Sequence, residues 1–117
     1  MKIKLTDQLN DYLKNKHPYL RAAEEAVFEV TGMTLEDLRG PRRFTDVVFA
    51  RMVFAYLCYD EVKPTVLLAS YLNRDHATVL YWHSKHEEYS KYDNLYIFML
   101  NAMENVFKQK IEEYGVF

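Results

Sequence analysis

Apolar residues recur at three- and four-residue steps along most of the chain, which is the period of an α-helix with one buried face. The first such series spans residues 5–13, with Thr6 placed to cap it. A second helix is predicted from Pro18 to Gly32, because proline suits a first helical turn and glycine suits a helix end. Thr34 is followed three residues later by an acid, which is the spacing of a capping box on a short helical turn.

The middle of the chain predicts three more helices in close succession. Residues 45–59 are apolar over most of a helical circumference, so this helix should be the central, buried one. A short helix follows over 65–72, and a longer one over 76–90 begins with Asp75 as its N-cap. The link 73–74 allows only a tight turn. Two helices joined in this way indicate a helix-turn-helix.

A last long helix begins at Asp93 and ends near Gly115, with apolar residues at helical spacing between them. The chain has 117 residues, half of them hydrophobic, which fits one domain with one core. Three Gly and three Pro leave little room for the turns of a β-sandwich. We therefore predict an all-α domain over residues 1–117. It would be a helix-turn-helix bundle with an added N-terminal helix and a long C-terminal helix, residues 91–117, that packs on the core or on a partner.

Charge changes this picture because it is unevenly distributed. The net charge of -2 argues at first against a nucleic-acid partner. Residues 39–91, however, carry eight Lys and Arg against six Asp and Glu, whereas the segments on either side are acidic. The densest basic run is Arg39-Gly40-Pro41-Arg42-Arg43, which also interrupts any helix. A connector does not need three arginines around a proline, and a local basic patch is what holds phosphates.

Other features exclude several classes of protein. The lone Cys58 cannot form an internal disulfide and no secretion signal is apparent, so we expect a cytoplasmic location. No apolar run approaches the ~18 residues of a membrane span, so no membrane partner is expected. The sequence has no Gly-rich phosphate loop, no Gly-x-Ser-x-Gly elbow and no paired carboxylates near a base. We therefore expect neither enzymatic activity nor a cofactor.

The histidines of the predicted 76–90 helix raise the question of a metal site. His76, His83 and His86 recur along one helix, but a fourth ligand is missing and Cys58 is expected inside the core. His83 and His86 continue the buried stripe from Val79 at helical steps. We expect these two to be core histidines bonded to tyrosine or backbone, and we expect no metal.

The run Arg74-Asp75-His76 at the start of the same helix has three possible interpretations. It could be a catalytic or metal cluster, a helix cap with solvated neighbours, or the leading edge of a helix that reads base edges in DNA. A cap is the simplest explanation of the run alone, since Asp at an N-cap stabilises a helix by ~1 kcal/mol without any ligand. Next to a helix-turn-helix and a basic loop, DNA reading is favoured.

The same residues resemble a known family. The chain contains Leu35-Glu36-Asp37-Leu38, then Arg42-Arg43, then Ala50-Arg51-Met52, and finally Arg74-Asp75-His76-x-Thr78-Val79-Leu80. This order is similar to the C-terminal DNA-binding domain of the bacterial replication initiator DnaA, a Trp-repressor-like helix-turn-helix. The resemblance covers roughly residues 20–90, and nothing resembles the initiator's ATPase domain. The chain departs from the family at Asn73, where two glycines are usual, and at Ala77, where a threonine is usual.

The resemblance implies a division of roles among the polar residues. Arg43 would enter the minor groove, where a narrow A·T-rich tract concentrates negative potential. In the major groove, Asp75 would accept from a cytosine amine, His76 would donate to a purine, and Ala77 and Thr78 would place methyl groups against thymine. Phosphate contacts are expected from Arg42, Arg51, Lys63, Arg74, Tyr81 and Lys85.

The resulting hypothesis is sequence-specific binding of double-stranded DNA by a stand-alone domain, in replication control or transcriptional regulation. One alternative stays open. The acidic, aromatic helix from Asp93 to Tyr114 could belong to a protein-interaction or oligomerisation module that pairs with a second copy or with a replication protein.

Overall fold

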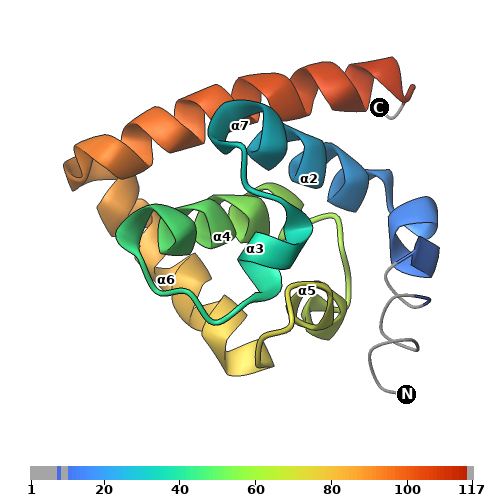
Figure 1. Cartoon of the computed structure of the whole chain (residues 1–117), viewed down its shortest axis with the longest axis horizontal. Helices are drawn as coiled ribbons and strands as arrows, with labels where there is room; N and C mark the ends of the chain where they lie inside the picture. Colours follow the sequence, from blue (N-terminus) through green and yellow to red (C-terminus); the bar gives the residue numbers. More distant parts are fainter. Residues whose placement is uncertain (1–7, 9–10, 116–117) are drawn as a thin grey trace.

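The computed structural model describes residues 8 and 11–115, and these form helices and connecting segments with no strand (Figure 1). A helical segment at 11–16 precedes the longer helices. The longer helices are α2 (Pro18–Thr31), α3 (Leu35–Arg39), α4 (Thr45–Cys58), α5 (Thr65–Tyr71), α6 (His76–Tyr92) and α7 (Asn94–Glu113). The all-α prediction is confirmed. Thr6 and its predicted cap lie outside the described residues.

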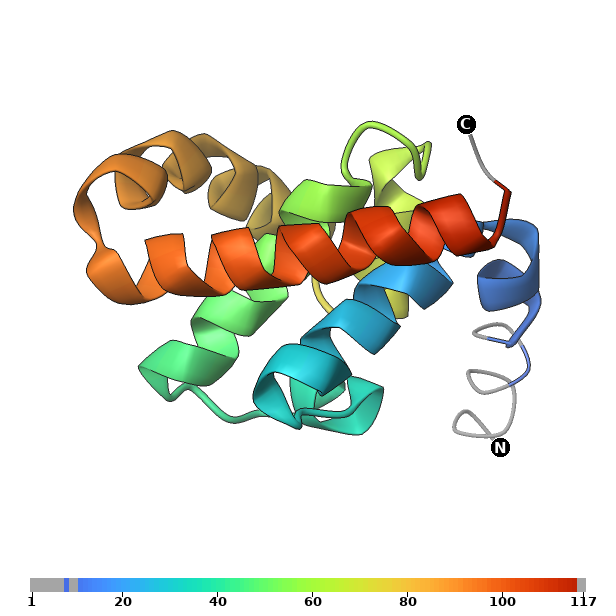
Figure 2. The same cartoon turned by 90° about the horizontal axis from the view of Figure 1, so that it is seen from above.

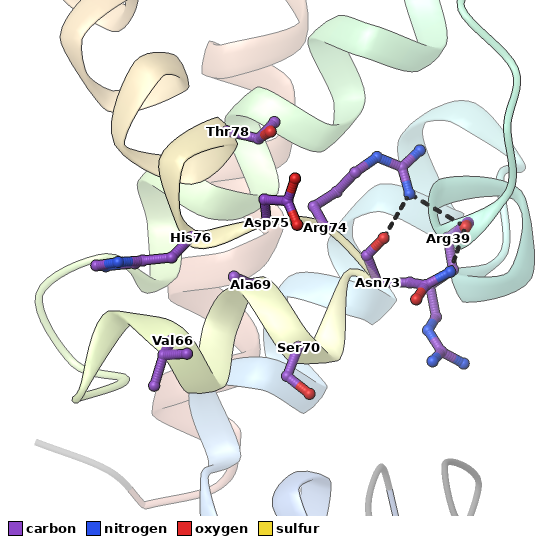
Figure 3. Close-up of a pocket in the computed structure, with 9 residues that line it drawn as sticks. All are labelled: Arg39, Val66, Ala69, Ser70, Asn73, Arg74, Asp75, His76 and Thr78. Atoms are coloured by element: carbon purple, nitrogen blue, oxygen red, sulfur yellow. Dashed lines mark hydrogen bonds between the residues drawn. The ribbon is translucent and has the colours of Figure 1, made fainter. Parts of the chain in front are cut away.

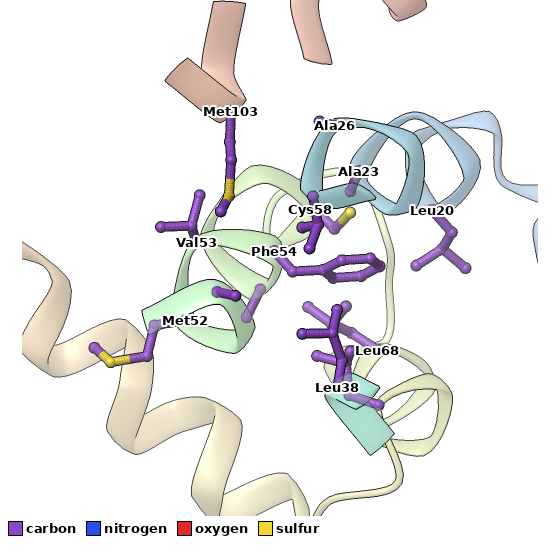
Figure 4. Close-up of a cluster of buried hydrophobic side chains, with 14 of the residues drawn as sticks. Leu20, Ala23, Ala26, Leu38, Met52, Val53, Phe54, Cys58, Leu68 and Met103 are labelled. Atoms are coloured by element: carbon purple, nitrogen blue, oxygen red, sulfur yellow. The ribbon is translucent and has the colours of Figure 1, made fainter. Parts of the chain in front are cut away.

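Helix α4 occupies the centre of the fold, as its nearly all-round apolar surface predicts. It contacts α2, α3, α6 and α7. Figure 4 shows Val53, Phe54 and Cys58 of α4 in a cluster with side chains from the surrounding helices. The fully buried residues that the other helices contribute to this cluster include Leu20, Ala23, Ala26, Leu38, Leu68 and Met103. Because burial of one large apolar side chain contributes roughly 1.5–3 kcal/mol, this cluster supplies much of the driving force for folding.

Helix α7 crosses over α2 and α4 on one side of the molecule (Figure 2). The ring of Phe107 lies 6.2 Å from that of Tyr19 on α2, measured between centroids. Lys110 forms an ion pair with Glu29 of α2 at 3.1 Å. At the other end of α7, Tyr96 is buried. The inner face of α7 therefore completes the domain's own core.

Three helix boundaries follow local rules of capping. Gly32 ends α2 in the left-handed conformation, with φ of 76°. Thr34 and Asp37 form the predicted capping box at the start of α3, and the backbone bond from Thr34 is the main cause that lowers the pKa of Asp37. The carboxylate of Asp93 accepts from the backbone N–H of Tyr96 at 3.0 Å and caps α7 as predicted.

The turn between α5 and α6 depends on one left-handed residue. Asn73 has φ of 56°. The N–H of Asn73 donates to the carbonyl of Ser70 at 3.0 Å, and the N–H of Arg74 donates to that of Ala69 at 2.9 Å. These two bonds form a Schellman motif, in which asparagine is the usual substitute for glycine. A single asparagine is therefore enough to make the tight turn.

A half-buried acid, Glu24, links α5 to the helical segment at 11–16. The hydroxyl of Tyr71 on α5 donates to one oxygen of Glu24 on α2 at 2.7 Å. The other carboxylate oxygen forms an ion pair with Lys14 at 3.2 Å. Burial, and then the bond to Glu24, raises the pKa of Tyr71. The first helix of the helix-turn-helix is thus anchored through Glu24.

The single cysteine lies in the core between α2 and α4. Cys58 is fully buried, and its thiol donates to the backbone carbonyl of Tyr19 at 3.4 Å. Burial raises the pKa of this thiol, so it stays protonated.

The two histidines in the middle of α6 have different environments. His86 is half-buried, stacks on Tyr56 at 3.7 Å and lies with Nδ1 2.6 Å from the hydroxyl of Tyr96. This contact confirms the predicted bond to tyrosine. His83, however, is exposed and stacks on Tyr59 at 3.6 Å, so its prediction as a core residue was wrong. The reason is that the buried stripe of α6 continues from Val79 to Trp82, three residues on, and not to His83, four residues on.

The environment of His86 should make stability depend on pH. Burial, and then the nearby His83, lowers its pKa, so folding favours the neutral ring. The unfolded chain then takes up a proton more readily, and the free energy of unfolding should fall as the pH drops below about 6.5. His86→Gln, which keeps an acceptor for Tyr96, should remove this component. Urea unfolding followed by circular dichroism on both sides of that pH measures it, and equal pH dependence in variant and wild type would contradict the assignment.

Candidate nucleic-acid interface

Residues 40–44, which connect α3 to α4, form a segment that we call the arginine strap. Arg43 of the strap lines the same pocket as Arg74 of the turn and Thr78 and Trp82 of α6. Figure 1 shows the strap and the start of α6 at the bottom of the molecule, with α7 at the top. The strap and the first turns of α6 therefore lie on one side, away from α7.

Arg51 of α4 fixes the strap from inside the fold. Its Nε donates to the carbonyl of Leu38 at 2.7 Å, and its terminal nitrogens donate to those of Gly40 at 2.9 Å and Arg42 at 2.5 Å. The side chain is only 3% exposed. The expectation that Arg51 contacts phosphate is therefore corrected, because its guanidinium is buried and bonded to backbone.

Arg74 connects the turn to the opposite side of the strap. Its guanidinium donates to the carbonyl of Arg39 at 3.1 Å and to that of Asn73 in its own turn at 3.1 Å (Figure 3). It also donates to the carbonyls of Gly40 at 2.5 Å and Leu72 at 3.3 Å. These contacts make Arg74 a tie between turn and strap. They do not support its expected role as a phosphate clamp.

Neither the buried Arg51 nor the half-buried Arg74 forms an ion pair with an acid among residues 8 and 11–115. All the hydrogen bonds of Arg51 and Arg74 within the described residues go to backbone carbonyls. Burial, and then the charge of Arg74, lowers the pKa of Arg51 to about 10. Burial, and then Arg43, lowers the pKa of Arg74. Three guanidinium groups thus repel one another here, which an anion placed over the strap would relieve.

The first turn of α6 is open to solvent. Asp75 occupies the N-cap position, but its carboxylate makes no cap hydrogen bond, which corrects the expectation of a side-chain cap. Asp75, His76 and Ala77 are exposed, and Thr78 is half-buried. In Figure 3, His76 points away from Arg74, toward the side on which Val66 and the start of α5 lie. The first turn of α6 thus carries the carboxylate of Asp75, which makes no cap bond, the imidazole of His76, and the methyl groups of Ala77 and Thr78.

The other residues expected at phosphates lie on both flanks of α6. Arg42 is exposed on the strap. On the opposite flank, exposed Lys63 lies over the ring of Tyr59, 4.3 Å from its centroid. Tyr81 is 57% exposed, and Lys85 lies 5.8 Å from its ring centroid and 3.9 Å from Glu88. Glu88 offsets part of the charge of Lys85.

Two residues of this side were not predicted as site residues. Arg39 lines the pockets on both sides of the turn, and its Nε–H has no hydrogen-bond partner in the described part of the chain. The sequence feature that could have identified Arg39 is its position in the basic run. Phe44 is 69% exposed at the end of the strap. The sequence feature that could have identified Phe44 is its position just before the predicted helix, outside the buried face of that helix.

Two further findings concern other kinds of site. Among residues 8 and 11–115, His, Cys, Asp and Glu side chains do not gather in any group of three that could hold a metal ion. In the same part of the chain, each helix is too short or too polar to cross a membrane.

A short helix, a Schellman turn and a second helix with its first turn exposed beside a cationic strap define a helix-turn-helix domain of the DNA-binding class. The chain belongs to the family described as the bacterial dnaA protein helix-turn-helix, whose model matches residues 22–85, more than half of the chain. The matched region contains the strap, the turn and the exposed start of α6, and it ends before α7. This family is a class of DNA-binding domains and not of enzymes. Neither the curated proteins nor the solved structures gave a match.

The buried contacts of Arg51 predict a structural rather than a surface role. Arg51→Met should lower the free energy of unfolding by about 3 kcal/mol, because it leaves the carbonyls of the strap and of α3 without donors. Arg42→Ala, on the exposed side of the same strap, is the matched control and should change it by less than about 0.5 kcal/mol. Urea denaturation measures both. Equal stability of the two variants would refute the structural role of Arg51.

Proposed function

We propose that this chain binds double-stranded DNA sequence-specifically and acts in replication control or transcriptional regulation. The observation that carries the proposal is the exposed first turn of α6 beside a rigid, positively charged strap. Membership of the DnaA helix-turn-helix family supports it. The overall negative charge is no obstacle, because Arg43, Arg51 and Arg74 concentrate positive charge at this side.

In this proposal the amino end of α6 enters the major groove. The free carboxylate of Asp75 suits a cytosine amine, and the imidazole of His76 suits a purine acceptor. Ala77 and Thr78 follow on the same turn, where their methyl groups suit thymine. Asp75, His76 and Ala77 are all exposed, so the helix needs no rearrangement to present them.

The strap and the flanks of α6 would hold the DNA backbone and the neighbouring groove. Arg43 would enter the minor groove next to the α6 site, since it lines a pocket in common with Thr78. Arg42 on one flank and Lys63 on the other would contact phosphates, with Tyr81 and Lys85 between them. Arg42 belongs to the strap, which borders α6 at Thr78 and Trp82, whereas Lys63 lies over Tyr59, the ring on which His83 of α6 stacks. These two sides of α6 suit the two strands that border a major groove.

Removal of cations that neutralise phosphates should reduce the salt dependence of binding. For Arg42→Ala/Lys63→Ala, the slope of log affinity against log salt should become shallower by about 1.8, or about 0.9 for each phosphate that is no longer neutralised. Arg21→Ala/Lys108→Ala removes the same charge from exposed sites on α2 and α7 and should keep the wild-type slope. Fluorescence anisotropy with a random duplex measures both. The proposal would be overturned if the two double variants had the same salt slope, or if the wild type did not bind the duplex at low salt.

Base reading by His76 should appear as a loss of sequence preference. His76→Ala should flatten the preference at one base pair by about 1–3 kcal/mol while leaving binding to random duplex nearly unchanged. Selection of bound sites from a random duplex pool, followed by sequencing, gives the preference of both proteins. An unchanged preference in the variant would exclude His76 from base reading.

A second candidate function is protein interaction through the outer face of α7. Tyr92, Leu95 and Phe98 form an exposed group of large apolar side chains at the corner between α6 and α7. Residues 94–103 contain no charged residue. Exposed apolar groups of this kind often mark protein contacts. The inner face of α7 is committed to the core, so only this outer face is available to a partner.

Self-association through this corner should be sensitive to charge. Phe98→Lys should lower the fraction of dimer in sedimentation equilibrium, because an unpaired ammonium would have to be desolvated in the contact. Phe28→Lys, at an exposed position on α2, is the control and should leave the distribution unchanged. A wild-type chain that stays monomeric at high concentration would remove the homodimer interpretation.

A further inference from the structure

Phe44 presents a large apolar ring at the DNA-facing side of the molecule. It is 69% exposed, more than Phe98 or Phe28, and is not among the side chains that pack against the core of the described residues. It directly follows Arg42 and Arg43 and occupies the N-cap position of α4, where it makes no side-chain cap bond. Neither burial nor capping therefore explains a phenylalanine here.

The backbone around Phe44 is fixed on both sides. On the strap side, the carbonyls of Gly40 and Arg42 accept from the buried guanidinium of Arg51. On the helix side, the carbonyl of Phe44 accepts from the N–H of Val48 at 2.9 Å and begins the α4 ladder. The ring is thus carried by a rigid support, so little backbone entropy is lost when it contacts a ligand.

The surroundings of the ring indicate the chemistry of its partner. Two exposed arginines precede it, and the acid nearest in sequence, Asp46, accepts a hydrogen bond from the N–H of Val47 at 2.9 Å. An apolar protein surface would have to desolvate both arginines. A duplex offers phosphates to the arginines and the stacked faces of its bases to the ring.

We propose that Phe44 is a wedge that inserts between two base pairs from the minor groove, next to the position of Arg43, and partly unstacks them. This inference rests on the proposed function and adds a specificity element to it. Unstacking is least costly at the flexible pyrimidine–purine steps TA and CA/TG. The preferred DNA therefore has such a step beside an A·T-rich tract, selected without a hydrogen bond to either base. The insertion also kinks the duplex toward the major groove.

The test uses duplexes from the random-pool selection, with 2-aminopurine substituted in turn for each adenine beside the A·T-rich tract. Its fluorescence rises when the base loses its stacking partner. A donor–acceptor dye pair on the duplex ends reports the kink. Wild type is compared with Phe44→Ala, with Phe44→Leu, which keeps apolar bulk, and with Phe98→Ala, which removes a similarly exposed ring from α7.

Wild type, Phe44→Leu and Phe98→Ala should each raise the fluorescence at one step and shorten the end-to-end distance. Phe44→Ala should lose both signals and about tenfold in affinity for duplexes with a flexible step. It should keep the wild-type salt slope, because the cations that neutralise phosphates are unchanged.

Three results would overturn the wedge. If bound wild type unstacks no step, Phe44 lies along the groove wall. If Phe44→Ala keeps both signals, another group makes the kink. If Phe44→Ala instead changes only the sedimentation of the protein, the ring belongs to a protein contact. Failure of wild type to bind any duplex at low salt would overturn the DNA-binding proposal itself, which distinguishes the two failures.

Discussion

The side of this domain that we propose to face DNA depends on the buried guanidinium of Arg51. A planar group with five donors can satisfy several carbonyls that diverge from one helix end, which no neutral side chain of similar size can do. Here it collects the carbonyls at the end of α3 and along the strap, where the backbone has left the helix and has no partners of its own. Without it, the strap would be a flexible loop. With it, the strap becomes a fixed edge beside α6.

Arg74 also donates to backbone carbonyls at the end of α3 and the start of the strap. The two arginines together connect the strap to α4 and to the turn before α6. Each is bonded to dipoles rather than to carboxylates, so its charge is held in place but not cancelled. The fold therefore places positive potential under the exposed residues Arg42 and Arg43. Residues that never touch a ligand can in this way strengthen its attraction, which pairwise contacts alone would not reveal.

The sequence predicted the helical architecture well because each element carries its own local signal. The all-round apolar surface of α4, Gly32 after α2 and the Thr34 box depend on neighbours within a few residues. The sequence did not predict the orientation of individual arginines. Arg42 and Arg51 look equally suited to phosphate in the chain, and only the packing of α3 against α4 buries one and exposes the other. His83 was misplaced because the buried stripe of α6 passes from Val79 to Trp82 instead.

For the candidate site, the family resemblance pointed to the surface that we propose for DNA, and helical spacing grouped Asp75 to Thr78 on one turn. The sequence showed Asn73 in place of the family's glycines. It did not show that one left-handed residue is enough for the turn, because the two Schellman bonds end on Ser70 and Ala69 of the preceding helix. Phe44 was not predicted as a site residue for another reason. An aromatic residue is ordinarily counted toward the core, and only its exposure in the structure shows that the core does not use it.

The thiol of Cys58 gives the domain a built-in reporter of its own opening. It is the single cysteine of the chain, it is fully buried between α2 and α4, and its raised pKa keeps it in the unreactive protonated form. An alkylating reagent can therefore reach it only when the core around it opens. The rate of labelling would then follow the frequency of that opening, and ligands that bind the closed form would slow it in proportion to their occupancy.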